Sequence, residues 1–90
     1  MIRNLRNLGI HSEKMLAKAG IVTEKRLEAL GAVKVYIAVK HAGAKPSLNL
    51  LWALEGALTD RDWKEIAKTR RFELLTELEL TEKHRKRSHR

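Results

Sequence analysis

The chain of 90 residues contains no cysteine. Disulfide bonds, thiolate zinc sites and cysteine nucleophiles are therefore excluded. Its four histidines offer no replacement, because His11 and His41 stand alone and the pair near the C-terminus has no carboxylate at ligand spacing. The sequence also has no catalytic acid pair, no nucleophile elbow and no glycine-rich phosphate loop. We expect no metal, no cofactor, no small-molecule substrate and no enzymatic activity.

Long apolar runs are absent as well. Lys or Glu interrupts every apolar stretch, so none approaches the length of a membrane span. The basic start, MIRNLRNLGI, has no apolar segment long enough for a signal peptide. We expect a cytoplasmic protein that does not enter a membrane.

Positive charge is what the chain has in excess, with 19 basic against 11 acidic residues and a formal net charge of +8. Such an excess predicts an anionic partner, nucleic acid above all. Five of the cations lie in the last eight residues, KHRKRSHR, and without them the body carries only +3. We therefore divide the chain into a helical domain, 1–82, and a basic tail, 83–90, with no apolar residue to bury. The tail is expected to be disordered, either as a solubilising end or as an arm along a nucleic-acid backbone.

Glycine and hydroxyl residues punctuate the sequence at short intervals, which is typical of several short helices. We expect Ser12 and Thr23 to cap helices that end at Gly20 and Gly31. The segment SLNLLWALEGAL (47–58) is apolar nearly all round and should form a central, buried helix.

After this central helix we expect two further short elements. Asp60 would cap a turn that contains Trp63. Thr69 would cap a last helix with Phe72, Leu75 and Leu78 facing inward. A tail that begins near residue 83 would follow this helix.

One segment allows two interpretations. Residues 33–39 alternate β-branched side chains as a strand does, yet a helix that ends near Gly43 also fits. A lone strand would have no partner, because no other segment alternates as cleanly. We therefore predict a helix over 33–42 and an all-α fold of five or six short helices around a central buried one.

A short internal echo relates the first two glycine turns. Shifted by 22 residues, LRNLGIHSEKM (5–15) superposes on LEALGAVKVYI (27–37), with Gly9 on Gly31. Each unit is the end of a helix, a glycine and the start of a new helix, as in tandem helix-hairpin-helix domains. The first amides of such a helix have no partner within it and can bind a phosphate.

The two turns differ as phosphate sites. Asn7 tolerates the left-handed backbone that the first turn needs, but Glu13 would compete with a phosphate for the same amides. The second turn has Lys34 and no acid, so we look first to Gly31 and Lys34. An ordinary helix junction is the competing interpretation of the first turn. The full set of candidate nucleic-acid-binding residues is Gly9, Ser12, Gly31, Lys34, Lys40, Arg70, Arg71, Lys83, Arg85, Lys86 and Arg87.

Four stretches, in this order, carry a family resemblance: LRNLGIHSEKMLAKAGI, LEALGAVKVY, PSLNLLWALEGAL and DWKEI. With them the chain resembles, over roughly residues 3 to 80, the C-terminal domain of the TfoX/Sxy competence-regulator family. The resemblance implies a fold similar to the helix-hairpin-helix domain of the RNA polymerase α-subunit. It also implies regulators of DNA uptake that assist transcription activation by the cyclic-AMP receptor protein, and not enzymes.

The chain departs from the family pattern in two respects. The α/β domain that usually precedes this one is missing, so a role narrower than that of the full-length proteins is expected. Proline and lysine commonly follow the hairpin glycine in the family, whereas Ile10 and His11 stand there in this chain. The missing cation weakens the case for a phosphate at the first turn.

These observations lead to one expected function and two alternatives. We expect a non-enzymatic regulator that assists transcription of DNA-uptake genes through contacts with DNA, of low sequence specificity, with the transcription machinery, or with both. The first alternative is a module that docks on a transcription factor or RNA polymerase without binding DNA. The second is a protein associated with RNA or the ribosome.

Overall fold

The fold is all-α, as the sequence predicts. A computed structural model describes residues 2–88, with side chains described for 2–83. A 3-10 helix and six α-helices follow one another in these residues: η1 (Ile2–Asn4), α1 (Ile10–Lys18), α2 (Glu24–Leu30), α3 (Ala32–His41), α4 (Leu48–Thr59), α5 (Trp63–Thr69) and α6 (Arg71–Ser88). The described residues contain no strand. A tandem helix-hairpin-helix arrangement and the likeness to the RNA polymerase α-subunit stay predictions.

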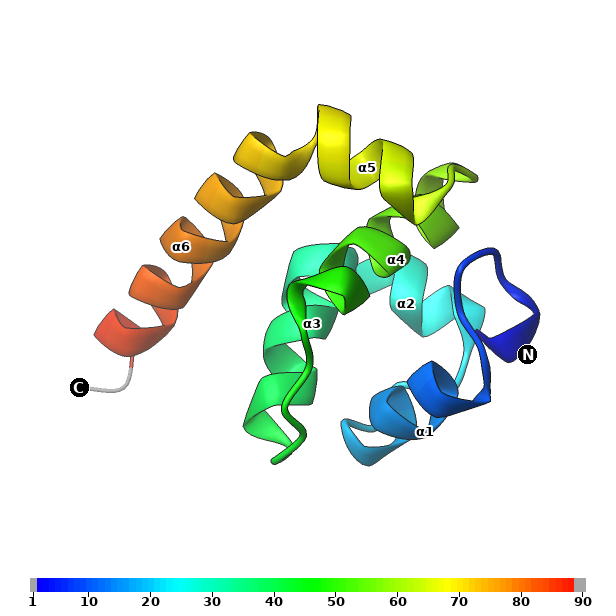
Figure 1. Cartoon of the computed structure of the whole chain (residues 1–90). Coiled ribbons are helices and arrows are strands. Elements are labelled where there is room, and N and C mark those ends of the chain that lie inside the picture. Colours follow the sequence, from blue (N-terminus) through cyan, green and yellow to red (C-terminus); the bar gives the residue numbers. More distant parts are fainter. Residues whose placement is uncertain (1, 89–90) are drawn as a thin grey trace.

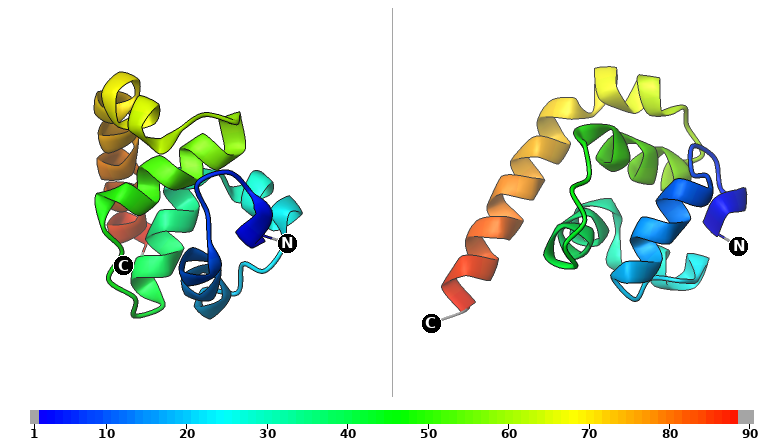
Figure 2. Two further views of the ribbon diagram at one scale, coloured as in Figure 1. Left: turned by 45° about the vertical axis from the view of Figure 1, so that its right-hand side comes forward. Right: turned by 60° about the horizontal axis from the view of Figure 1, so that its bottom comes forward.

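Helices α3 and α4 form the middle of the molecule. α5 and α6 run along one side of this pair, and α1 and η1 lie on the other (Figures 1 and 2). In α4, the side chains of Leu51 and Leu54 have no exposed surface, and four further residues of the helix are buried. The prediction of a central, buried helix over 47–58 is confirmed.

The β-branched segment belongs to α3 and is helical. Six of its ten residues are buried, because α1, α2, α4 and α6 all contact this helix. Burial on several sides needs apolar residues at nearly every position, so the alternation of Val and Ile carries no strand signal here. The helical interpretation of 33–42 is confirmed.

Three of the helix ends lie where the sequence places them. The hydroxyl of Thr23 accepts a hydrogen bond from the Arg26 amide at 3.1 Å and caps α2. Gly20 and Gly31 follow their helices with positive φ of 80° and 81°. The prediction for Ser12 is wrong, since α1 begins two residues earlier and its N-cap is Gly9.

Both predicted caps after α4 are also wrong. Asp60 ends α4 in a left-handed conformation, and Asp62 caps α5 by accepting a hydrogen bond from the Lys64 amide at 2.8 Å. Thr69 is the last residue of α5, where its hydroxyl donates to the Glu65 carbonyl at 2.9 Å. In both cases, a polar residue near a helix boundary can either cap the start of the next helix or end the preceding one, and the sequence pattern does not distinguish the two.

The face of α6 that packs against the core agrees only in part with the predicted one. Leu74 and Leu78 are buried, Leu75 is half-buried, and the side chain of Phe72 is 81% exposed. The inward position of Leu78 is confirmed and that of Phe72 is wrong, because α6 packs toward α3 through Leu74 and Leu78. α6 continues through Ser88, past the boundary we set at residue 83. The division into domain and tail, and the disorder of the tail, stay predictions.

Tyr36, which is the only tyrosine of the chain, stabilises the loop between α3 and α4 by a hydrogen bond. Its ring is buried, and its hydroxyl donates a hydrogen bond to the Pro46 carbonyl at 3.2 Å. Desolvation raises the pKa of this hydroxyl above its ordinary value of 10.0, against the opposing influence of the Lys40 charge.

Replacing Tyr36 with phenylalanine should lower the free energy of unfolding at neutral pH by about 0.5–1.5 kcal/mol, because the Pro46 carbonyl loses its donor. The wild type should lose further stability above pH 10, since Tyr36 ionises more easily in the unfolded chain than in the folded one. Below pH 10 both states are protonated and this effect is absent. Urea unfolding of both proteins at neutral and alkaline pH measures the two effects on the free energy of unfolding. If Tyr36→Phe lost as much stability at alkaline pH as the wild type, the loss could not be assigned to ionisation of Tyr36.

Candidate functional site

The first glycine turn has the backbone that the sequence suggests. Asn7 adopts a left-handed conformation with φ of 70°, Leu8 is buried, and Gly9 is extended and begins α1. An asparagine reaches this conformation at little cost, whereas most other side chains crowd the backbone there.

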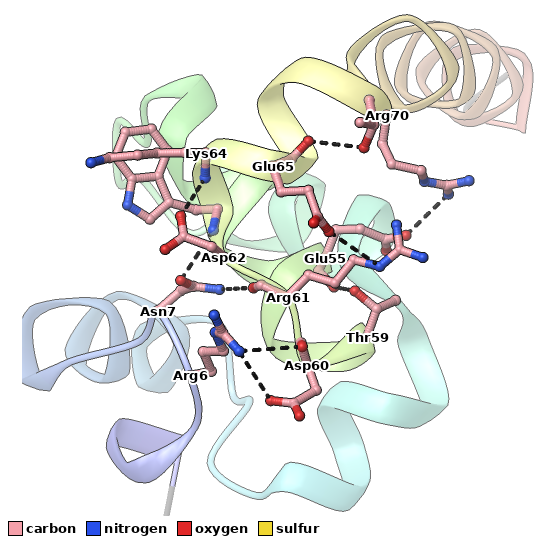
Figure 3. A network of polar contacts seen from close by, with 12 residues as sticks. Arg6, Asn7, Glu55, Thr59, Asp60, Arg61, Asp62, Lys64, Glu65 and Arg70 are labelled. Atoms are coloured by element: carbon pink, nitrogen blue, oxygen red, sulfur yellow. Dashed lines mark hydrogen bonds and ion pairs between the residues drawn. The ribbon is translucent and has the colours of Figure 1, made fainter.

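The side chain of Asn7 reaches across the molecule rather than toward solvent. Its Nδ2 donates to the Arg61 carbonyl at 2.7 Å, and its Oδ1 accepts from the Trp63 amide at 3.2 Å. Arg61 belongs to the connection between α4 and α5 (Figure 3), and Trp63 is the first residue of α5. The side-chain amide of Asn7 thus forms hydrogen bonds with a backbone carbonyl 54 residues later in the chain and with a backbone N–H 56 residues later.

Gly56 makes this contact possible. It lies in α4, and the space above its Cα is filled by the Asn7 amide nitrogen and the Arg61 carbonyl oxygen. We call Asn7, Gly56, Arg61 and Trp63 the Asn7 junction. The sequence does not predict this junction, although Gly56 is a signal for it, because a glycine inside a buried helix indicates a close packing contact.

The first turn is therefore committed to holding the fold together. Arg6 adds a hydrogen bond to the Asp60 carbonyl at 3.4 Å beside the junction (Figure 3). Glu13, in the first turn of α1, accepts a hydrogen bond from the Arg3 amide at 3.0 Å. Of the two predicted residues here, Gly9 is exposed and Ser12 is half-buried beside a hollow of about 320 Å³ that Asn7 and Trp63 also border.

The second glycine turn is more open to an anion. Gly31 both ends α2 and begins α3, and its N–H donates to the Leu27 carbonyl at 2.9 Å. Lys34 follows in the first turn of α3, which contains no acid, and its side chain is exposed. It has no ion-pair partner among the side chains that the structure describes.

The amides of this second turn are less available than the charge of Lys34. Ala32 and Val33, which supply the first two amides of α3, are only 4% and 1% exposed. An anion would therefore be attracted mainly by the Lys34 ammonium and by the positive end of the α3 dipole, and not held in a cradle of N–H groups.

Two of the predicted cations are paired within the fold. Lys40 Nζ lies 3.1 Å from Glu82 Oε2 and joins α3 to α6. Arg70 lies 3.0 Å from Glu55 and 2.7 Å from Glu73, which links α4 to the start of α6. Carboxylates at these distances neutralise much of the field of the cations, so both contribute less to a nucleic-acid surface than their formal charge suggests.

The remaining predicted cations are spread over α6 rather than gathered at Lys34. Arg71 and Lys83 are exposed, and neither has an ion pair to any side chain of residues 2–83. The side chains of Arg85, Lys86 and Arg87 lie outside the described residues. The described part of the chain also has no group of His, Asp or Glu side chains suited to a metal ion. No helix in that part is long and apolar enough to cross a membrane.

Known proteins match this chain over nearly its whole described length. The family model of the TfoX C-terminal domain covers residues 1–78. The DNA transformation protein TfoX of Haemophilus influenzae is 29% identical over 77 residues, which are 86% of this chain and 36% of that protein. The chain thus spans little more than a third of the length of this curated relative.

A solved structure shares the fold. The crystal structure of an uncharacterized protein from Listeria monocytogenes superposes with a TM-score of 0.77 at 27% identity, over 90% of this chain and 92% of that one. The family model spans the Asn7 junction and the Gly31 turn, because it covers residues 1–78. The chain belongs to the TfoX C-terminal domain family.

Proposed function

We propose that this domain is a non-enzymatic regulatory module of DNA uptake, which assists transcription of uptake genes and contacts DNA with low sequence specificity. Membership of the TfoX C-terminal domain family over residues 1–78 is the observation that carries the proposal. The name of the Haemophilus influenzae relative, a DNA transformation protein, supports the same process. That relative is much longer, so the proposal concerns what this domain contributes.

We place the DNA contact at the start of α3. Lys34 is exposed, has no ion-pair partner among the described side chains, and stands at the positive end of a helix of ten residues. Lys40 and Arg70 contribute less, because Glu82, Glu55 and Glu73 balance them. Arg71, Lys83 and the basic end of α6 add non-specific attraction to phosphates.

The variant Lys34→Glu should weaken binding to a labelled DNA duplex by roughly tenfold at low salt, and reduce the slope of log K against log salt by about one. The loss of one phosphate contact and the repulsion of a new carboxylate both act in this direction. Fluorescence anisotropy over a salt series measures the affinity and the slope. Lys68→Glu is the matched control, because Lys68 is exposed, lies on α5 and carries the same charge change.

Three outcomes separate the alternatives. An equal loss in both variants means that net charge alone attracts DNA and the start of α3 has no special part. Retention of the full salt slope when Arg85, Lys86 and Arg87 are changed to Gln shows that the C-terminal cations are dispensable. No binding of the wild type at low salt ends the DNA proposal and leaves docking on the transcription machinery.

A further inference from the structure

The outer face of α6 carries an apolar stripe. Phe72, Thr76 and Leu80 recur every four residues, and Phe72 and Leu80 are 81% and 57% exposed. The short side chain of Thr76 lies between the two larger ones and leaves a groove of about 370 Å³, which Glu73 and Glu77 also border. The two apolar ends of this groove lie about 12 Å apart along the helix, which is about two helical turns and close to the distance between side chains i and i+7 of a partner helix.

This stripe takes no part in the core of the domain. Leu74 and Leu78 form the opposite, buried face of α6 and pack toward α3. The outer face has no covering element among residues 2–83, and Figures 1 and 2 show α6 along the edge of the molecule. Exposure of a phenylalanine and a leucine on the same face of a helix is unfavourable in water and is typical of an interaction surface.

The charge around the stripe is negative on a basic protein. Residues 72–82 contain four glutamates and no Lys or Arg, although the chain as a whole carries +8. Arg70 balances Glu73 at 2.7 Å, but Glu77 has no ion pair to any described side chain. This acidic flank repels DNA and anionic lipid surfaces, and it attracts Lys or Arg.

The same flank opposes pairing with a second copy of the chain. In an antiparallel pair of α6 helices centred on Thr76, twofold symmetry sets the flank with Glu73 and Glu77 beside the identical flank of the other copy. In a parallel pair, the flank with Glu73 and Glu77 would lie beside the opposite flank of the other copy, which holds Glu79. Like charges meet in both arrangements, so a basic partner fits the surface better than a second copy does.

We propose that the outer face of α6 binds an amphipathic helix of another protein. Apolar side chains of that helix enter the groove between Phe72 and Leu80, and its Lys or Arg side chains pair with Glu77 and Glu73. The interaction is independent of DNA contact at Lys34, because residues 72–82 of α6 are acidic and the start of α3 is basic. The domain then has two surfaces, one for an anionic and one for a cationic partner.

A model peptide with the stated chemistry tests the surface. The probe is a fluorescein-labelled amphipathic helical peptide with leucines on one face and lysines on the other, titrated with the whole chain in an anisotropy assay. We expect Phe72→Ser to weaken its binding by about tenfold or more, since aromatic anchors dominate such interfaces. Val22→Ser is the matched control: Val22 is 64% exposed, lies outside α6, and should leave binding unchanged.

A charge swap tests the acidic flank separately. A second peptide, with glutamates in place of the lysines, should bind Glu77→Lys better than it binds the wild type, and the lysine peptide should bind Glu77→Lys more weakly. Because Phe72 and Glu77 are exposed, both variants should keep the melting temperature of the wild type, and their duplex-DNA affinity should not fall.

Three results would overturn the proposal. One is equal affinity of the lysine peptide for the wild type and Phe72→Ser, and another is no binding of this peptide at all. The third is a dimer in sedimentation equilibrium that Phe72→Ser dissociates, which would assign the stripe to a second copy of the chain. A failure of DNA binding in the Lys34 experiment affects none of these outcomes.

Discussion

Replacing Gly56 with alanine should lower the free energy of unfolding by about 2–4 kcal/mol. The added Cβ would lie 2.5 Å from the Arg61 carbonyl oxygen and would also collide with the Asn7 amide nitrogen. Neither can withdraw easily, because the carbonyl belongs to the backbone and the amide is held by two hydrogen bonds. In an unobstructed helix, the same change stabilises by about 0.5–1 kcal/mol, so even the sign of the result is informative.

Urea unfolding followed by circular dichroism measures this effect. Gly9→Ala is the control, since a Cβ at Gly9 meets nothing within 4 Å and its backbone is extended. We expect this control to lose no more than about 1 kcal/mol, as is usual when alanine replaces a better N-cap residue. A Gly56→Ala protein at least as stable as the wild type would show that the Asn7 junction accommodates the added Cβ without loss of stability.

Asn7→Ala should be the second strongly destabilising change, by about 2–4 kcal/mol. Two backbone groups, the Arg61 carbonyl and the Trp63 amide, lose their partners, and alanine must adopt a φ of 70°. Asn7→Gly separates these contributions, because glycine accepts that conformation and loses the hydrogen bonds only. We expect it to be more stable than Asn7→Ala by about 1 kcal/mol.

The two positions should also be coupled. In the Asn7→Gly background, Gly56→Ala meets the Arg61 carbonyl but no longer the Asn7 amide, so it should cost about 0.5–2 kcal/mol less than in the wild type. A double-mutant cycle in the same unfolding assay gives this coupling energy. Strict additivity would mean that Asn7 and Gly56 act independently, against the geometry of the junction.

The parts of the fold that depend on neighbouring residues could be predicted from the sequence. Thr23 caps α2 through an amide three residues away, and Gly31 ends that helix by its own backbone freedom. The helix over 33–42 was predicted by elimination, because a single strand has nothing to pair with. Local chemistry decided the cap and the glycine, and the lack of a second strand-like segment in the chain decided the helix. Both can be read directly from the sequence.

The features that depend on distant residues could not be predicted in this way. The predicted inward residues Phe72, Leu75 and Leu78 recur every three residues, which is helical spacing. The pair Leu74 and Leu78 has helical spacing too, and only the position of α3 decides that this pair is buried and Phe72 is exposed. The same holds for the charges: Lys40 and Arg70 look available in the sequence, yet Glu82 and Glu55 pair with them from 42 and 15 residues away. Asn7 was considered for its backbone alone, and the partners of its side chain lie in the second half of the chain.

The Asn7 junction also orders events during synthesis of the chain. Asn7 is made before the Arg61 carbonyl that it binds, which follows 54 residues later. At about 5–20 residues per second, the two groups are separated by roughly 3–11 s of translation. The first turn therefore leaves the ribosome before the partners of Asn7 exist. Its side-chain hydrogen bonds can form only after α4 and the start of α5 have emerged. The domain closes from its last-made half back onto its first.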